Sequence, residues 1–149
     1  DVLVNNAGYG QLGMFEENSR EAIERQFAVN VFGLFDVTRA VLPVMRHRRG
    51  GRIFNITSIG GIRGSEGGSL YCATKFAVEG LTLALAEELP PGLAAVALNP
   101  GVIATDLLRS CFGPSAEHYP SPDEWSQRAV PFLLSLGPQD NGASLTAPG

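Results

Sequence analysis

The chain has 149 residues, of which 44% are hydrophobic and 17% are charged, and this composition excludes an intrinsically disordered segment. The formal net charge of −4 argues against a general binder of nucleic acid or of acidic membranes, because such proteins carry a basic excess. No uninterrupted apolar run approaches the roughly 18–20 residues that a membrane-spanning helix needs. Two cysteines are too few for a disulfide framework, so we expect reduced thiols and a cytoplasmic location.

The first half of the chain predicts a strand followed by a long helix. Residues 1–4 form an apolar run, and the sequence Asn-Asn-Ala-Gly after it predicts a tight turn. Asn18 or Ser19 would cap the helix, because apolar residues recur at helical spacing from Ile23 to Met45.

The middle of the chain predicts two further strands around a second long helix. Residues 52–58 are the second strand, and a glycine-rich stretch covers residues 60–68. Residues 70–89 predict a helix whose apolar positions wrap around most of its surface, so we expect it to be buried on more than one side. Residues 94–98 are the third strand.

The last third of the chain predicts less regular structure. We expect irregular backbone over residues 102–124, a helix over 125–136 and a short strand over 142–146. Strands and helices alternate, and the main strands are near-continuous apolar runs. Both features favour an α/β fold in which helices cover the two faces of a parallel sheet, giving three layers, α/β/α.

The segment from Gly8 to Gly13 matches the pattern G-x-G-x-x-G after a strand. A dinucleotide-binding turn of this kind needs a helix that begins inside the glycine run, so that its first turn meets the pyrophosphate. The helix signals here come later, at Asn18 and Ser19. We therefore expect these glycines to form a loop beside an active site instead.

Tyr71 and Lys75 are four residues apart near the start of a predicted helix, which places both side chains on one face. A nearby ammonium favours the phenolate form of tyrosine, whose ordinary pKa is about 10. Ten of the eleven basic residues are arginine, and Lys75 is the single lysine. Codon bias would explain this count, but so would a site that needs a compact ammonium.

Two other polar residues stand where ligands or catalytic groups are often found. Ser58 ends the second predicted strand, and open α/β sheets place their ligands at the carboxyl ends of strands. Asn30 lies in an apolar stretch of the first helix, where it would hold a water, kink the helix or pair with a neighbouring carbonyl.

Taken together, these residues resemble the short-chain dehydrogenase/reductase family. The matching pieces are Asn5-Asn6-Ala7-Gly8, Asn30, Ser58, Tyr71-x-x-x-Lys75 and Asn99-Pro100-Gly101 followed by Thr105. The resemblance implies a Rossmann-like doubly wound parallel sheet and an oxidoreductase that transfers a hydride between a nicotinamide cofactor and a carbonyl or alcohol substrate.

The resemblance also implies roles for individual residues. Tyr71 would be the general acid/base, Ser58 would polarise the substrate oxygen, Lys75 would lower the pKa of Tyr71 and hold the nicotinamide ribose, and Asn30 would anchor a water. Other residues would bind the cofactor: Asn6, Ala7 and Gly8 on the adenosine side, and Pro100, Gly101, Val102 and Thr105 at the nicotinamide end.

The tail of the chain is similar to a plant-type subgroup of NADPH-dependent pterin aldehyde reductases. The similar segments are Ser110-Cys111-Phe112-Gly113, Pro122-Asp123-x-Trp125 and the run from Asp140 to Thr146. We therefore expect NADP(H) rather than NAD(H) and an aldehyde substrate. By analogy with the family, residues 106–125 would form a substrate lid, and the two long helices would pair subunits into a dimer or tetramer.

The family's Thr-Gly-x-x-x-Gly-x-Gly turn, which follows its first strand, is not found in the chain, and neither are three of the family's strands. We therefore expect residues 1–149 to be the carboxyl-terminal portion of a single Rossmann-type domain. A catalytically incompetent binding or scaffold protein remains an alternative. A serine hydrolase using Ser58 is a weaker one, because no G-x-S-x-G surrounds this serine and the only histidines are His47 and His118. No metal-ligand cluster is visible in the sequence.

Overall fold

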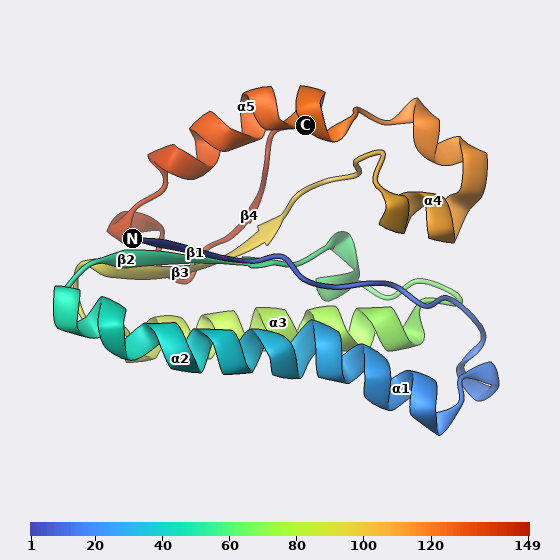
Figure 1. The fold of residues 1–149 in the computed structure, drawn as a ribbon, viewed down its shortest axis with the longest axis horizontal. Coiled ribbons are helices and arrows are strands. Elements are labelled where there is room, and N and C mark those ends of the chain that lie inside the picture. The colour runs from blue at the N-terminus through green and yellow to red at the C-terminus, as the bar shows by residue number, and fades with distance from the viewer.

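The computed structural model describes residues 1–149 and contains one sheet of four parallel strands. The strands are β1 (Val2–Asn5), β2 (Gly51–Ile56), β3 (Leu93–Asn99) and β4 (Ser144–Thr146), and they lie side by side in this order. All of them run in the same direction, so their carboxyl ends meet at one edge of the sheet (Figure 1).

Helices cover both faces of the sheet, as the sequence predicts for a doubly wound α/β fold (Figure 1). One face carries α1 (Arg20–Phe27), α2 (Gly33–Arg48) and α3 (Ser69–Glu88); the other carries α4 (Asp106–Phe112) and α5 (Pro122–Ser135). Single turns of 3-10 helix are found at Phe15–Glu17, Ile59–Gly61, Gly113–His118 and Pro138–Asp140.

The alternation of side chains along β2 assigns one set to each layer of helices. Ile53 packs with Met45 of α2 and Leu85 of α3. Phe54, the next residue, points to the other face and packs with Leu136 just after α5. The sheet is therefore covered by apolar side chains on both faces, as expected for parallel strands.

The connection from β3 to β4 passes over the face opposite to the one that the two earlier connections use. Since the strand order continues in the same direction, this crossover has the opposite hand to the two before it. Its consequence is that α3 and α4 approach the carboxyl edge of the sheet from opposite faces (Figure 1). Side chains from both layers can therefore reach the same point at that edge.

The first long helix begins after Ser19, whose side chain accepts a hydrogen bond from the backbone N–H of Ala22. It continues to Arg48 through a π-helical turn at Ala28–Phe32. By length and composition alone this helix could cross a membrane. The sequence pattern did not predict this, because the helix contains no uninterrupted apolar run of the required length. The same test is met by core helices, and here buried Asn30 is hydrogen-bonded to the loop after β1.

Three predictions need correction. The stretch 102–124 is not irregular: Thr105 caps the helix α4 by accepting a hydrogen bond from Leu108, and α5 begins at Pro122 because Ser121 and Glu124 form a capping box. Strand β2 ends at Ile56 rather than at residue 58. Helix α3 buries one broad face and leaves Phe76 and Leu83 about half exposed, so it is not buried on several sides within this chain.

Candidate active site

The predicted catalytic residues lie at the carboxyl edge of the sheet. Ser58 follows β2, and Tyr71 and Lys75 lie one turn apart on the first part of α3. Asn30 belongs to the π-helical turn between α1 and α2. The structure therefore brings together four residues that are spread over 46 positions of the sequence, from 30 to 75 inclusive.

Lys75 is buried, and its ammonium group donates a hydrogen bond of 2.9 Å to the backbone carbonyl of Ile56 at the end of β2. The same nitrogen lies 5.6 Å from the centre of the Tyr71 ring. Burial lowers the pKa of Lys75 to about 8, because the charged form loses its hydration. An ammonium has three donors, so two of them remain for a ligand at this edge.

The ring of Tyr71 lies between two glycines. A methyl group at Gly10 would approach one edge of the ring at 3.4 Å, and a methyl group at Gly60 would approach the other at 3.5 Å. Burial raises the pKa of Tyr71 above its usual value, and the nearby Ser58 hydroxyl acts in the opposite direction. At neutral pH the phenol therefore carries its proton.

Ser58 caps the short helical turn at Ile59–Gly61. Its hydroxyl oxygen accepts a hydrogen bond of 3.2 Å from the backbone N–H of Gly60. This contact orients the serine close to the Tyr71 phenol and leaves its hydroxyl proton free to donate.

Asn30 links three segments through its amide group. Its oxygen accepts a hydrogen bond from the Tyr9 N–H at 3.0 Å, and its nitrogen donates to the Tyr9 carbonyl at 2.8 Å and to Thr74 Oγ1 at 3.2 Å. The Thr74 hydroxyl in turn donates to the carbonyl of Tyr71 at 2.7 Å. Of the alternatives for Asn30, pairing with a neighbouring carbonyl is therefore present, together with a local π-helical turn.

The glycine pattern from Gly8 to Gly13 does not open a helix, since α1 begins only at Arg20. The segment is a loop against the site, as predicted, and it is held by side chains of the first helix. Gln26 adds a second donor to the Tyr9 carbonyl at 3.3 Å, one helical turn before Asn30.

The predicted cofactor residues after β1 are Asn6, Ala7 and Gly8, and all three are exposed. A methyl group at Gly8 would lie 3.2 Å from the Asn30 amide oxygen and 3.8 Å from the Lys75 ammonium. The missing side chain therefore leaves the ammonium within reach of a ligand over this loop. The buried hydroxyl of Thr57 has no hydrogen-bond partner. These features fit a ligand with hydroxyl groups, such as the ribose of a nicotinamide cofactor.

The predicted residues after β3 form a turn that distant side chains hold in place. Asn99 accepts a hydrogen bond from the Gly101 N–H at 3.1 Å, and the indole N–H of Trp125 donates to the carbonyl of Pro100 at 2.8 Å. Val102 is exposed in this turn, and Thr105 lies next to it as the cap of α4. The predicted cofactor residues therefore lie at the same edge as the catalytic ones.

Sequence reasoning missed a chain of buried polar groups that ties the sheet to its helices. Asn5 donates to Thr38 at 2.9 Å and to Asn55 at 2.8 Å, and Asn55 donates to Thr82 at 2.9 Å. Polar residues inside apolar strands and helices are the signal that could have revealed it. The chain connects the strand ends that carry the Asn6–Gly8 loop and Ser58.

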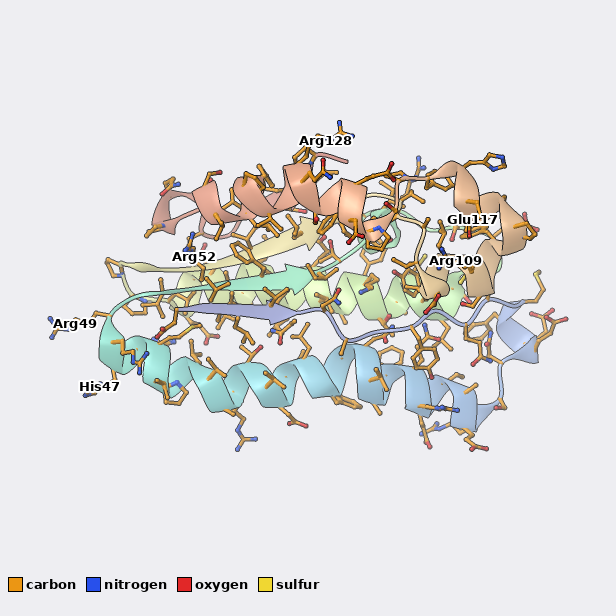
Figure 2. All side chains as sticks on the ribbon, turned by 45° about the horizontal axis from the view of Figure 1, so that its top comes forward. His47, Arg49, Arg52, Arg109, Glu117 and Arg128 are labelled. Atoms are coloured by element: carbon orange, nitrogen blue, oxygen red, sulfur yellow. The ribbon has the colours of Figure 1, made fainter.

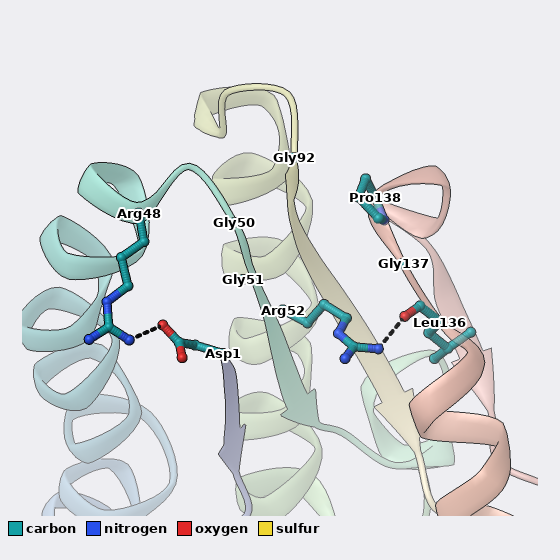
Figure 3. Close-up of a pocket in the computed structure, with 9 residues that line it drawn as sticks. All are labelled: Asp1, Arg48, Gly50, Gly51, Arg52, Gly92, Leu136, Gly137 and Pro138. Carbon is teal, nitrogen blue, oxygen red and sulfur yellow. Dashed lines mark hydrogen bonds and ion pairs between the residues drawn. The ribbon is translucent and has the colours of Figure 1, made fainter.

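A cavity of about 460 Å³ lies at the opposite, amino edge of the sheet (Figure 3). Its two arginines are already engaged: Arg48 pairs with Asp1 at 2.7 Å, and Arg52 donates to the carbonyls of Leu134 and Leu136. Because α/β sheets bind ligands at their carboxyl edge, we assign no activity to this cavity.

Neither histidine is hydrogen-bonded to Ser58. His47 projects from the end of α2 beside Arg49 at the amino edge (Figure 2), and His118 is exposed with its ring nitrogen 3.1 Å from the carbonyl of Ser115. The arrangement contains no Ser-His pair of the kind a serine hydrolase needs. No group of three or more His, Cys, Asp or Glu side chains is placed to hold a metal ion.

Comparison with known proteins identifies the family of the chain. The family model for short chain dehydrogenase matches residues 1–113. The chain is 45% identical over 147 residues to an NADPH-dependent pterin aldehyde reductase of Arabidopsis thaliana, which covers 98% of this chain and 61% of that protein. The chain therefore belongs to the short-chain dehydrogenase/reductase family, and its fold is part of that family's Rossmann-type domain.

Two solved structures are similar over nearly the whole chain. A short-chain dehydrogenase from Streptomyces avermitilis has a TM-score of 0.81 and 34% identity, covering 100% of this chain and 60% of that one. A gluconate 5-dehydrogenase from Burkholderia cenocepacia in complex with NADP and tartrate has a TM-score of 0.85 and 26% identity, covering 98% and 62%. The chain thus spans about 60% of the length of the proteins it matches.

Proposed function

We propose that the native protein is an NADP(H)-dependent oxidoreductase that reduces a carbonyl group, with Tyr71 as the general acid. The observation that carries this proposal is the juxtaposition of Tyr71, Lys75 and Ser58 at the carboxyl edge of the sheet. Membership of the short-chain dehydrogenase/reductase family supports the reaction class.

The bound nicotinamide cofactor supplies the hydride. In the direction of reduction, Ser58 donates a hydrogen bond to the substrate oxygen and Tyr71 transfers its phenolic proton to that oxygen. The raised pKa of Tyr71 keeps this proton in place until the substrate arrives. Lys75 stabilises the phenolate that results, and Asn30 anchors a water through which the proton is replaced.

The cofactor would lie along the loop after β1 and the turn after β3. Asn6, Ala7 and Gly8 would line its adenosine side, and Lys75 would hold the nicotinamide ribose with donors that the Ile56 carbonyl does not use. Pro100, Gly101, Val102 and Thr105 would hold the nicotinamide end. NADP(H) is preferred to NAD(H) because the Arabidopsis relative is described as NADPH-dependent and the Burkholderia structure holds NADP.

The substrate we propose is an aldehyde. The Arabidopsis relative is named a pterin aldehyde reductase, and its similarity to this chain extends through the tail that follows β3.

The test is the Tyr71→Phe variant of the native protein. It removes one oxygen and keeps the aromatic ring that lies between Gly10 and Gly60, so the fold and NADPH binding should persist. We expect NADPH oxidation with aldehydes to fall by a factor of about 10² or more. Retained turnover would contradict the role of Tyr71. If the unmodified protein does not change NADPH fluorescence, a non-catalytic binding or scaffold role becomes the better explanation.

We also propose that the native protein is a homodimer or homotetramer paired through its two long helices. Phe32 and Phe35 on the first helix and Phe76 and Leu83 on α3 are 40–56% exposed in the single chain. These side chains lie on helices that cover the same face of the sheet (Figure 1). Leu83→Glu should lower the molar mass measured by light scattering, and a native protein that is monomeric would contradict the proposal.

A further inference from the structure

The surroundings of the Tyr71 phenol are small and uncharged on the side that α4 covers. Gly10 lies at one edge of the ring, and the thiol of Cys111 and the side chain of Leu107 close over this glycine from α4. A methyl group at Gly10 would be 3.5 Å from Cys111 Sγ and 3.6 Å from Leu107 Cδ1. The thiol also faces the carbonyl of Gly10 at 3.9 Å. A ligand whose carbonyl reaches Tyr71 would therefore meet apolar and weakly polar atoms here.

The charged side chains of α4 face outward and neutralise one another. Arg109 pairs with Asp106 at 3.0 Å and with Glu117 at 2.7 Å, and all three side chains are exposed. Figure 2 shows Arg109 and Glu117 together at this end of the molecule. The one arginine of α4 that could recognise a carboxylate is thus held by two carboxylates of the chain itself.

The charged neighbour of the phenol, the Lys75 ammonium 5.6 Å from the ring centre, belongs to α3 and not to the side that α4 covers. The groups that act on the pKa of Tyr71, besides burial, are the Ser58 hydroxyl and the thiols of Cys111 and Cys72. No Asp, Glu or Arg is among them. A carboxylate brought next to the substrate carbonyl would lose its hydration without gaining a cationic partner from this wall, and such burial is costly.

We propose that this site selects uncharged carbonyl compounds, and that Gly10, Leu107 and Cys111 form the wall that rejects an anionic group next to the carbonyl. This proposal rests on the proposed function and adds the substrate class to it. The wall belongs to two segments, the loop after β1 and α4, that are about 100 residues apart in the sequence.

The first test uses matched pairs of substrates with the native protein and NADPH. 2,3-Butanedione and pyruvate differ little in shape but only pyruvate carries a carboxylate, and benzaldehyde and 2-carboxybenzaldehyde form a second pair. We expect kcat/KM for the uncharged member to be higher by about tenfold or more in each pair. Equal or reversed preference would overturn this proposal while leaving the proposed function intact. Absence of NADPH binding and of turnover with any carbonyl compound would count against the proposed function itself.

The second test places a cation in the wall. Cys111→Arg should lower the preference for the uncharged member by about tenfold, because the anionic substrate then gains a partner. Ser110→Arg adds the same charge to the neighbouring exposed position and should leave the preference unchanged, as should Cys111→Ser. A shift of equal size in Ser110→Arg would mean that the wall does not set the selectivity. Arg109→Gln removes the outward arginine, and a changed preference in that variant would assign substrate recognition to Arg109 instead.

Discussion

The ammonium group of Lys75 lies 5.6 Å from the centre of the Tyr71 ring, and the hydrogen bond that it donates goes to the strand instead, at the carbonyl of Ile56. Lys75 is not among the groups that shift the pKa of Tyr71, which is raised, so the predicted lowering of that pKa by Lys75 is not found in this structure. We expect the two side chains to act together through a shared ligand instead. The strand carbonyl sets the position of the ammonium, so the distance between the two side chains depends on how α3 packs against β2.

Lys75→Arg tests whether this position needs an ammonium. The guanidinium is planar and larger, and it cannot keep the 2.9 Å contact to Ile56 while lying close beneath Gly8. We expect kcat/KM for carbonyl reduction to fall by a factor of about ten or more, although the positive charge is retained. Circular dichroism would confirm that the variant is folded. Activity close to that of the unmodified protein would leave codon bias as the explanation for the single lysine.

Lys75 should also make the stability of the fold depend on pH. Its pKa is about 8 in the folded state and 10.5 when unperturbed, so between these values the unfolded chain binds more protons. The free energy of unfolding should therefore rise as pH increases from about 8 towards 10, by an amount on the order of 3 kcal/mol over the full range. Above pH 10 the raised pKa of Tyr71 acts in the opposite direction, because the folded state then holds the extra proton.

The measurement is urea denaturation of the native protein at several values between pH 7.5 and 10. Lys75→Met is the matched control, since it keeps a long unbranched side chain and removes the titrating group. Its unfolding free energy should be higher than that of the unmodified protein at pH 7.5 and should vary less with pH. Parallel curves for the two proteins would rule out this role of Lys75.

Thr74 is a positioning residue that sequence reasoning did not single out. It is fully buried, and its hydroxyl accepts from Asn30 and donates to the carbonyl of Tyr71. Thr74→Val keeps the shape but removes both bonds, whereas Thr74→Ser keeps them. We expect kcat in the valine variant to fall about fivefold, the effect of one hydrogen bond of roughly 1 kcal/mol, with KM for NADPH unchanged. Equal losses in the two variants would show that packing, not hydrogen bonding, matters here.

Trp125 fixes the turn proposed to bind the nicotinamide end of the cofactor, through its 2.8 Å hydrogen bond to Pro100. Trp125→Phe removes this donor and keeps an aromatic ring. We expect the Kd for NADPH, measured by NADPH fluorescence, to rise several-fold, because the carbonyl of Pro100 loses its partner and the turn loses a restraint. Ser126→Ala, at the next position on α5, removes only a local hydrogen bond to Asp123 and should bind NADPH normally. Unchanged affinity for NADPH in Trp125→Phe would show that the hydrogen bond from Trp125 to Pro100 does not contribute to cofactor binding.

Much of the fold could be read from local patterns. The parallel sheet followed from apolar strands that alternate with helices, and the start of the first helix followed from Ser19. Helix α4 was not predicted because the prolines that follow it favoured irregular backbone over residues 102–124. Thr105 as the cap and Asp106 as a favourable charge in the first turn are the signals of this helix. The half-exposed side chains of α3 were misjudged because an apolar pattern does not say which neighbour covers it.

By itself, the sequence determined that Tyr71 and Lys75 share one face of a helix, because an α-helix returns to the same face after four residues. It also indicated that Ser58 lies near the carboxyl end of a strand, where ligands of parallel sheets bind, although β2 itself ends at Ile56. Only the tertiary structure decided that Lys75 donates a hydrogen bond to the carbonyl of Ile56. It also decided that the Tyr71 ring lies between Gly10 and Gly60, with Leu107 and Cys111 of α4 close to Gly10. These contacts join segments far apart in the chain, and their distances depend on how the two helical layers pack on the sheet rather than on any local pattern.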